Sequence, residues 1–120
     1  MRSLFQLSSP RPEGFRDADP ALLSRHLAEA TVVDVREPDE FDGDLGHIAG
    51  ASLVPLSTVP KVAASWERDR EIVLVCRSGG RSGYAARQLV AMGFRRVVNL
   101  QGGMLAWNAQ RLPVARDRAA

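Results

Sequence analysis

Three short runs of apolar, mostly β-branched residues constrain most strongly how this chain can fold. They occupy residues 31–35 (TVVDV), 71–75 (EIVLV) and 96–100 (RVVNL). These runs lack the polar alternation of a half-exposed strand and are short for a buried helix, so they predict strands that are covered on both faces. Residues 52–54 form a shorter candidate strand, which Pro55 ends.

Segments with helical spacing of apolar residues lie between these runs. They cover residues 20–30, 59–66, 82–92 and 104–109. Asp19 followed by Pro20 predicts an N-cap with proline at the first helical position. Gly93 lies where a left-handed C-terminal cap would end the third helix. The faces expected to be buried consist of Leu23, Leu27 and Ala30 in the first helix, Val59, Val62 and Trp66 in the second, and Ala85, Ala86, Leu89, Val90 and Met92 in the third.

Strands that alternate with helices predict an α/β fold, with a small parallel β-sheet and helices on both of its faces. No internal repeat or linker divides the 120 residues, so we expect one domain over residues 15–114. Residues 1–14 contain Ser, Pro and Gly without periodicity and are expected to form a flexible leader. Residues 115–120 are expected to form a short tail.

The charge balance and the cysteine count exclude several classes of function. Sixteen basic and fourteen acidic residues leave a net charge of +2, so nucleic acid is not an expected partner. A single cysteine excludes an intramolecular disulfide and a multi-cysteine zinc site, and no metal or cofactor is expected. No run approaches the ~18 apolar residues of a membrane span, and the first residues lack the apolar core of a signal peptide. We therefore expect no membrane association and a reducing, cytoplasmic setting.

The only cysteine, Cys76, directly follows the second predicted strand and begins the loop CRSGGRS at residues 76–82. Ligands of open parallel sheets bind beyond the carboxyl ends of the strands. Gly79 and Gly80 allow positive φ, so the loop can turn its N–H groups inward as an anion-binding nest. The N-terminus of the following helix, Arg77 and Arg81 add positive charge, and all of these favour the thiolate, which is the nucleophilic form. The alternative is that Cys76 is only a small buried core residue.

Four motifs together resemble a single-domain rhodanese, which is a sulfurtransferase. They are DVRE at residues 34–37, GHIAGA at 46–51, CRSGGRS at 76–82 and GGMLAW at 102–107, in the order and spacing of the family. The resemblance covers residues 15–114 and implies a rhodanese-like fold. It also implies that Cys76 accepts a sulfane sulfur from thiosulfate or a persulfide donor. The resulting Cys76 persulfide would pass that sulfur to cyanide or to a thiol acceptor, including a thiol of a protein partner.

The resemblance and the loop chemistry together suggest a role for each residue of the loop. Cys76 is the expected nucleophile, and Arg77 and Arg81 are expected to hold the anionic thiosulfate and its departing sulfite. Backbone groups of the loop are expected to bind the substrate at Ser78, Gly79, Gly80, Arg81 and Ser82. Preorganised N–H donors stabilise developing charge, so the reaction needs no general base.

A count of loop residues separates this chemistry from that of phosphatases with the rhodanese-like fold. Those enzymes need a cysteine, five residues and then an arginine around the phosphate. Here four residues separate Cys76 from Arg81, and Ser82 occupies the next position. We therefore expect the loop to be too tight for phosphate, which disfavours phosphatase and arsenate-reductase chemistry.

Three polar residues outside the loop have both a functional and a structural interpretation. Asp34 and Arg36 follow the first strand and face the same side. They could order the Cys76 loop as supporting residues, but a structural ion pair at the end of the strand is the favoured interpretation. His47 could serve as a base for Cys76, yet no third group that would orient it is evident, so we expect it in a packed turn.

The last motif and the two tryptophans also allow expectations. Trp66 and Trp107 are expected in the core, because an indole buries a large area. Gly102 and Gly103 follow the third strand at the edge where the Cys76 loop lies, and are expected to allow a close approach of backbones. Met104 is a candidate for the mouth of the site.

The chain departs from the family pattern at two local positions. Residues 42–45 make the turn before the GHIAGA motif about two residues longer than in many members, which is expected to reshape one side of the entrance. Arg111 stands where glycine is usual, so the last helix must end in a left-handed non-glycine residue or in another geometry.

A second interpretation keeps the fold and the reactive cysteine but not the turnover of thiosulfate. In it, the chain is a sulfur-relay or binding module that acts with a partner protein. The intact Cys76 loop argues against a purely structural domain, because rhodanese-like interaction domains commonly lack the cysteine. It does not distinguish the relay from a free-standing enzyme.

Overall fold

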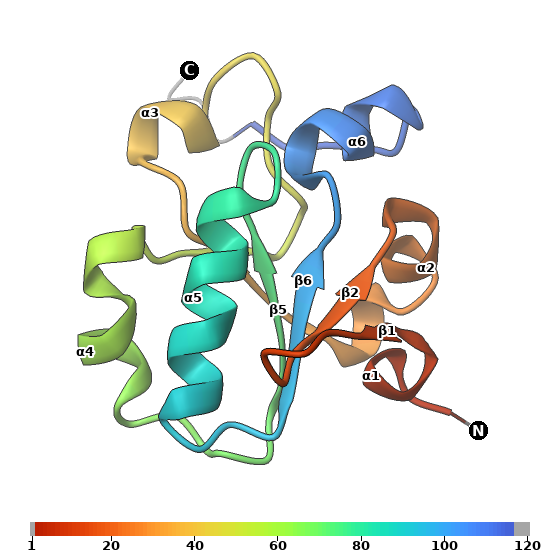
Figure 1. Cartoon of the computed structure of the whole chain (residues 1–120). Helices are drawn as coiled ribbons and strands as arrows, with labels where there is room; N and C mark the ends of the chain where they lie inside the picture. The colour runs from red at the N-terminus through yellow and green to blue at the C-terminus, as the bar shows by residue number, and fades with distance from the viewer. Residues whose placement is uncertain (1, 117–120) are drawn as a thin grey trace.

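The three apolar runs form the central strands of one sheet in the computed structural model, which describes residues 2–116. They are β3 (Thr31–Asp34), β5 (Glu71–Val75) and β6 (Arg96–Leu100), and β5 pairs in parallel with both of the others (Figure 1). The apolar residues of β5 are at most 1% exposed. The prediction of strands covered on both faces is therefore confirmed for the centre of the sheet.

Short strands complete the sheet on either side, in the order β1-β2-β6-β5-β3-β4. β4 (Ser52–Leu53) lies beside β3, at the position of the shorter candidate strand. On the other side, β2 (Arg16–Ala18) pairs in parallel with β6, and β1 (Ser9–Pro10) pairs antiparallel with β2. The expected parallel sheet is thus mostly parallel, with one antiparallel edge strand that the sequence pattern did not indicate.

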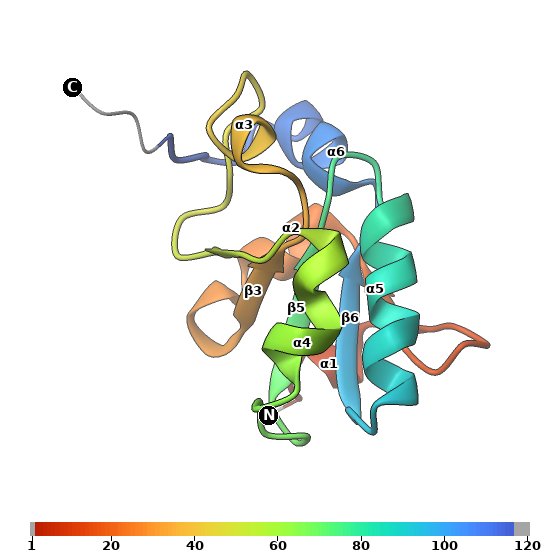
Figure 2. The same ribbon diagram turned by 90° about the vertical axis from the view of Figure 1, so that its left-hand side faces the viewer.

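Helices cover both faces of this sheet, as the turned view of Figure 2 shows. Helices α4 (Val59–Ala63) and α5 (Gly80–Ala91) pack on one face against residues such as Val33 and Leu74. Helices α1 (Leu4–Leu7), α2 (Pro20–Ser24) and α6 (Gly103–Ala109) lie over the other face, against residues such as Val32 and Val73. Because neighbouring strand residues point to opposite faces, the two apolar layers form separate cores. The predicted α/β architecture with helices on both faces is confirmed.

Residues 2–14 differ from the flexible leader expected from their composition. Ser3 caps α1, and Leu4 is 0% exposed because it packs in the core beneath the sheet. Ser9 and Pro10 pair with β2. Buried apolar area and strand pairing therefore order a segment that lacks periodicity. At the other end, Ala115 forms a β-bridge with His47, whereas residues 117–120 of the expected tail lie outside the described residues.

Two of the predicted helices are shorter than their apolar spacing indicated. The segment over residues 20–30 is α2 followed by a separate 3₁₀ turn, η1 (Leu27–Glu29). In the next segment, Val62 is 40% exposed, while Val59 and Ala63 are fully buried. The expected inward position of Val62 was wrong, because η2 (Leu56–Thr58) leads into α4 so that Val59 and Ala63, at an i, i+4 spacing, face the sheet.

The helix ends follow the expected chemistry more closely. Asp19 Oδ1 accepts a hydrogen bond from the backbone N–H of Leu22 at 2.8 Å, with Pro20 at the first helical position. Gly93 ends α5 with φ of 98°. Arg111 takes φ of 56° after α6, so this helix ends in a left-handed non-glycine residue.

The carboxyl ends of β3, β5 and β6 lead into segments at one end of the molecule. The loop after β5 lies there together with α3 (Pro38–Phe41) and α6, as both views show (Figures 1 and 2). This arrangement brings distant parts of the sequence around Cys76. Within residues 2–116, no helix is long and apolar enough to span a bilayer.

Candidate active site around Cys76

Cys76 directly follows β5 and begins the loop of residues 76–82, whose last three residues form the start of α5. Gly79 takes φ of 105° there, a left-handed conformation that favours glycine. The turn directs the Gly79 N–H toward Cys76 Sγ, with N and Sγ 3.0 Å apart. Ser82 Oγ, on the first turn of α5, is 3.2 Å from the same sulfur. The Cys76 side chain is therefore held inside the loop, and the residue is only 1% exposed.

These contacts lower the pKa of the Cys76 thiol. Burial acts in the opposite direction and raises the pKa, because a thiolate loses its hydration. Hydrogen bonds from the Ser82 hydroxyl and from the backbone N–H groups of Ser82, Gly79 and Ser78 outweigh that effect and stabilise the thiolate. The loop therefore stabilises the nucleophilic form of a buried sulfur, which a cysteine used only for packing does not require.

The start of α6 fixes this loop from the other side. The N–H of Met104 donates to the carbonyl of Cys76 at 2.9 Å, and the N–H of Leu105 donates to the carbonyl of Arg77 at 3.0 Å. A Cβ at Gly103 would lie 2.5 Å from both carbonyl oxygens, so the two backbones approach as the glycine pair predicted. Met104 itself is fully buried in the core, and its expected place at the mouth of the site was wrong.

The two arginines of the loop have different surroundings. The Arg81 guanidinium forms a bidentate ion pair with Glu40 on α3, at 2.7 and 2.8 Å. Its side chain thus joins the loop to α3 and is not directed only at a substrate. Arg77 is exposed and has no ion pair within residues 2–116, so it is the arginine free to hold an anion. Sequence reasoning missed Glu40, because its partner is 41 residues away.

The ion pair between Glu40 and Arg81 is expected to make the stability of the fold depend on pH in acid. Hydrogen bonding to Arg81 lowers the pKa of Glu40 from its ordinary value near 4.5 to about 2. A carboxyl whose pKa is lowered by folding adds stability above its unfolded pKa, and that stability is lost as the pH falls through the folded pKa. Between pH 4.5 and 2 we expect the wild type to lose about 1 kcal/mol more stability than Glu40→Gln. The loss is smaller than the full pKa shift implies, because solvent screens the partly exposed pair. Thermal unfolding across this interval measures the difference, and parallel curves for the two proteins would contradict it.

Asp34, the last residue of β3, and Arg36, two residues further on, form the ion pair favoured from their positions. The Arg36 guanidinium donates to both oxygens of the Asp34 carboxylate at 2.8–3.2 Å, and both side chains are 1% exposed. Arg36 also donates to the carbonyls of Glu40 at 3.1 Å and of Gly46 at 2.8 Å. This pair stabilises the segment that carries α3, and through Glu40 it supports the loop from a distance.

The ring of His47 is engaged in the turn around residues 41–47. Its Nδ1 lies 2.8 Å from the carbonyl oxygen of Phe41, and the two rings stack with centroids 3.6 Å apart. His47 is 2% exposed, as expected for a packed turn. Trp107 is fully buried and donates to the carbonyl of Pro113 at 3.0 Å, while Trp66 is partly buried against Phe94.

Two further polar residues that sequence reasoning did not assign stand behind the sulfur. Asn99, on β6, accepts a hydrogen bond from Ser82 Oγ at 2.5 Å. Its Nδ2 donates to Asp17 on β2 at 3.1 Å. The signal for Asn99 was a polar residue between the apolar Val98 and Leu100 of β6. For Asp17 there was none, because β2 is short and polar.

Shallow hollows flank the loop on two sides. One, of about 400 Å³, is lined by Ser78, Gly79 and Gly80 of the loop and by Asp17 and Asn99. The other, also about 400 Å³, is lined by Arg77, by Asp39 and Glu40 of α3, and by residues 43–45. Three residues of the longer turn, 43–45, thus lie in the same hollow as Arg77.

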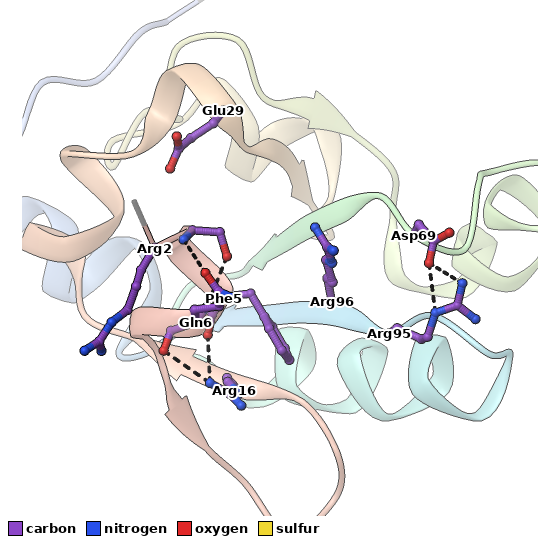
Figure 3. Close-up of a pocket in the computed structure, with 9 residues that line it drawn as sticks. Arg2, Phe5, Gln6, Arg16, Glu29, Asp69, Arg95 and Arg96 are labelled. Atoms are coloured by element: carbon purple, nitrogen blue, oxygen red, sulfur yellow. Dashed lines mark hydrogen bonds and ion pairs between the residues drawn. The ribbon is translucent and has the colours of Figure 1, made fainter.

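A larger hollow, of about 580 Å³, lies at the opposite end of the sheet, where β6 begins (Figure 3). Its arginines include Arg16, which stacks on the Phe5 ring with its Cζ 4.4 Å from the centroid, and Arg95, which pairs with Asp69. No thiol is among the described residues that line this hollow, since the only cysteine of the sequence, Cys76, lies in the loop after β5.

Comparison with known proteins identifies the family of this chain. The family model of the rhodanese-like domain matches residues 19–110, which is most of the chain. The chain belongs to the rhodanese-like domain family. A sulfurtransferase of Allochromatium vinosum is 37% identical over 101 residues, which cover 82% of this chain and 92% of the relative. Sulfur transfer is therefore the general chemistry of this rhodanese-like protein, and its fold is that of the family.

Solved structures and other relatives extend the comparison. A rhodanese-related protein from Thermoplasma volcanium has a TM-score of 0.77 and 32% identity, with 84% of this chain and 98% of that chain covered. A putative sulfur carrier protein of Bacillus subtilis, YrkF, is 38% identical over 66% of this chain and 42% of the relative. This rhodanese-like chain thus has relatives named as sulfurtransferases and as sulfur carriers.

Proposed function

We propose that this rhodanese-like protein moves a sulfane sulfur from thiosulfate or a persulfide donor to cyanide or a thiol acceptor, through a persulfide on Cys76. The observation that carries the proposal is the pair of hydrogen-bond donors at Cys76 Sγ, the Gly79 N–H with its N at 3.0 Å and the Ser82 hydroxyl at 3.2 Å, which favour the thiolate. Thiolates are the nucleophiles of sulfur chemistry. Such a centre suits a reducing, cytoplasmic setting, in which the thiol stays free.

The reaction balances without a cofactor or an external oxidant. The Cys76 thiolate attacks the outer sulfur of thiosulfate, and a bond between Sγ and that sulfur forms. The sulfur–sulfur bond of thiosulfate breaks, and its electron pair leaves with sulfite. The thiolate of an acceptor, or cyanide, then attacks the terminal sulfur of the persulfide, and the Sγ–S bond breaks to restore the Cys76 thiolate. Because the chain holds no second cysteine, the loaded sulfur must leave to an acceptor outside this chain.

A mass measurement tests the proposal directly. The protein is incubated with thiosulfate, and the peptide that contains Cys76 is examined for the gain of one sulfur atom. Cyanide is then added, and thiocyanate is measured. A one-sulfur gain that disappears as thiocyanate forms supports the proposal, and the absence of any sulfur gain contradicts it.

A second prediction concerns Arg77 and the charge of the sulfur donor. Its guanidinium is exposed beside the loop and unpaired within the described part of the chain, so it is the group that would hold an anionic donor. Arg77→Ala is expected to lower kcat/KM for thiosulfate about tenfold and to lower it much less for a neutral persulfide donor. Steady-state kinetics with both donors measures the effect, and equal losses would contradict an anion clamp at Arg77.

One observation also supports the relay function. The Arg81 guanidinium, expected to assist Arg77 with thiosulfate, is engaged by Glu40. A site with one free arginine binds a small dianion less strongly than a site with two. In a relay, sulfur arrives from a partner protein and the small anion is not needed. A persulfide that forms but turns over slowly with thiosulfate and cyanide, and quickly with a protein persulfide donor, would favour the relay.

A further inference from the structure

A chain of polar groups leads from Cys76 into the protein, away from the entrance of the loop. Cys76 Sγ lies 3.2 Å from Ser82 Oγ, which lies 2.5 Å from Asn99 Oδ1. Asn99 Nδ2 then donates to Asp17 Oδ1 at 3.1 Å. Ser82 is 0% exposed and Asn99 is 7% exposed, so solvent does not replace these contacts. The four groups come from the loop, α5, β6 and β2.

The orientation of the Asn99 amide is fixed by what lies on each side. Its Nδ2 faces the Asp17 carboxylate and, at 3.5 Å, the carbonyl oxygen of Gly79. An ionised carboxylate and a backbone carbonyl both accept hydrogen bonds and donate none. The amide therefore presents its NH₂ to them and its Oδ1 to Ser82.

Ser82 has a single hydroxyl proton but two possible acceptors for it. A hydroxyl donates one hydrogen bond, and the amide oxygen Oδ1 of Asn99 can only accept. When Cys76 is a neutral thiol, its S–H can donate to Ser82 Oγ, and Ser82 donates to Asn99. When Cys76 is a thiolate, Ser82 stabilises it only by turning its proton to Sγ. Asn99 Oδ1 then loses its donor. The two hydrogen bonds of Ser82 thus compete.

We propose that Asn99 is a positioning residue that draws the Ser82 proton away from Cys76 Sγ whenever that sulfur carries no negative charge. Ser82 favours ionisation of the Cys76 thiol, and Asn99 thereby opposes it. For the persulfide, this inference rests on the proposed function. There the negative charge lies on the terminal sulfur and Sγ is a weak acceptor, so the Ser82 proton returns to Asn99. Asn99 therefore favours the loaded state over the free thiolate.

The neighbouring charged groups are the same in the variants that test this idea. They are Arg77 and Arg81 on the loop, Asp17 on β2, Asp34 at the end of β3, Arg36 just after it, and Glu40 on α3. Any change in the titration of Cys76 on substitution of Ser82 or Asn99 therefore follows from their hydrogen bonds and not from a removed charge.

The test is the titration of Cys76 in the full-length protein, read from the rate of alkylation by iodoacetamide against pH. Cys76 is the only cysteine, so the readout is unambiguous and does not depend on sulfur transfer. Ser82→Ala is expected to raise the pKa of Cys76, and Asn99→Leu is expected to lower it by about one unit, a tenfold rise in the thiolate fraction below the pKa. The double variant is expected to match Ser82→Ala, because Asn99 acts through Ser82.

A matched control comes from the same helix as Ser82. Gln88→Leu on α5 also replaces an amide, and its Oε1 has no donor within residues 2–116, so no change in the pKa of Cys76 is expected. An unchanged or raised pKa of Cys76 in Asn99→Leu overturns the inference. It is also overturned if the pKa of Cys76 in the double variant differs from that in Ser82→Ala. The same holds if Gln88→Leu lowers the pKa of Cys76 as much as Asn99→Leu does. If the leucine variant does not fold, Asn99→Ala removes the same acceptor and is read in the same way.

If sulfur loading fails while the titration follows this pattern, the proposed function is wrong and the positioning of Ser82 by Asn99 stands. If Cys76 gains a sulfur atom but its titration does not follow this pattern, the positioning of Ser82 by Asn99 is wrong and the proposed function stands.

Discussion

Cys76→Ser is expected to lose sulfur loading altogether and to lower the rate of thiocyanate formation by at least about 1000-fold. The hydroxyl of serine is a far weaker nucleophile than a thiolate, and the N–H of Gly79 and the hydroxyl of Ser82 do not ionise it at neutral pH. The sulfur adduct is read by mass spectrometry, and turnover is read from thiocyanate formation.

Two controls make this result specific. Wild-type protein that has first been alkylated with iodoacetamide should fail in the same way, since Cys76 is the only thiol. The variant should keep the thermal unfolding midpoint of the wild type within a few degrees, because serine and cysteine are close in size. A folded Cys76→Ser protein that still gains a sulfur atom would show that another group carries it.

The second large effect is on stability, at Arg36. Arg36→Leu leaves the Asp34 carboxylate buried without its partner, with both side chains 1% exposed in the wild type. The carbonyls of Glu40 and Gly46 also lose a donor. Removal of one member of a buried ion pair costs about 3–5 kcal/mol, so we expect a loss of that size in the free energy of unfolding in urea. Soluble yield should fall as well, because such a loss is a large part of the stability of a small domain.

The exposed ion pair of Arg95 with Asp69 supplies the comparison. Its side chains are 67% and 70% exposed, so Arg95→Leu should cost no more than about 1 kcal/mol. Replacement of both members of the buried pair, Asp34→Leu with Arg36→Leu, should recover part of the loss, because no charge is then left unpaired. Equal costs at Arg36 and Arg95 would contradict a structural role for the buried pair.

The parts of the fold that could be predicted are those whose signal lies in local sequence. β3, β5 and β6 are buried on both faces, so apolar side chains are required at nearly every position. β2 was missed because it is three residues long with two polar side chains, and its conformation depends on pairing with β6. α1 was missed because it is a single turn, with Leu4 as its one fully buried residue.

The site divides in the same way. The nucleophile, the glycines and the helix start are contiguous, so CRSGGRS was sufficient to place Cys76 in a thiolate-stabilising loop. The contacts that refine the loop are not contiguous. Glu40 reaches Arg81 from α3, and Asn99 reaches Ser82 from β6, over 41 and 17 residues. Ser82 was expected to act through its backbone, and its hydroxyl contact with Sγ appears only when α5 is placed against β5.

The hydrogen bonds from Met104 and Leu105 to the Cys76 loop have a consequence for the synthesis of the protein. A nascent chain exposes the thiol well before α6 has left the ribosome, and domains fold as units once their sequence has emerged. The carbonyls of Cys76 and Arg77 find these donors only after residues 104 and 105 have emerged and α6 has packed on the sheet. The backbone of the Cys76 loop is therefore held in its final place only once a segment nearly 30 residues further along the chain has been synthesised.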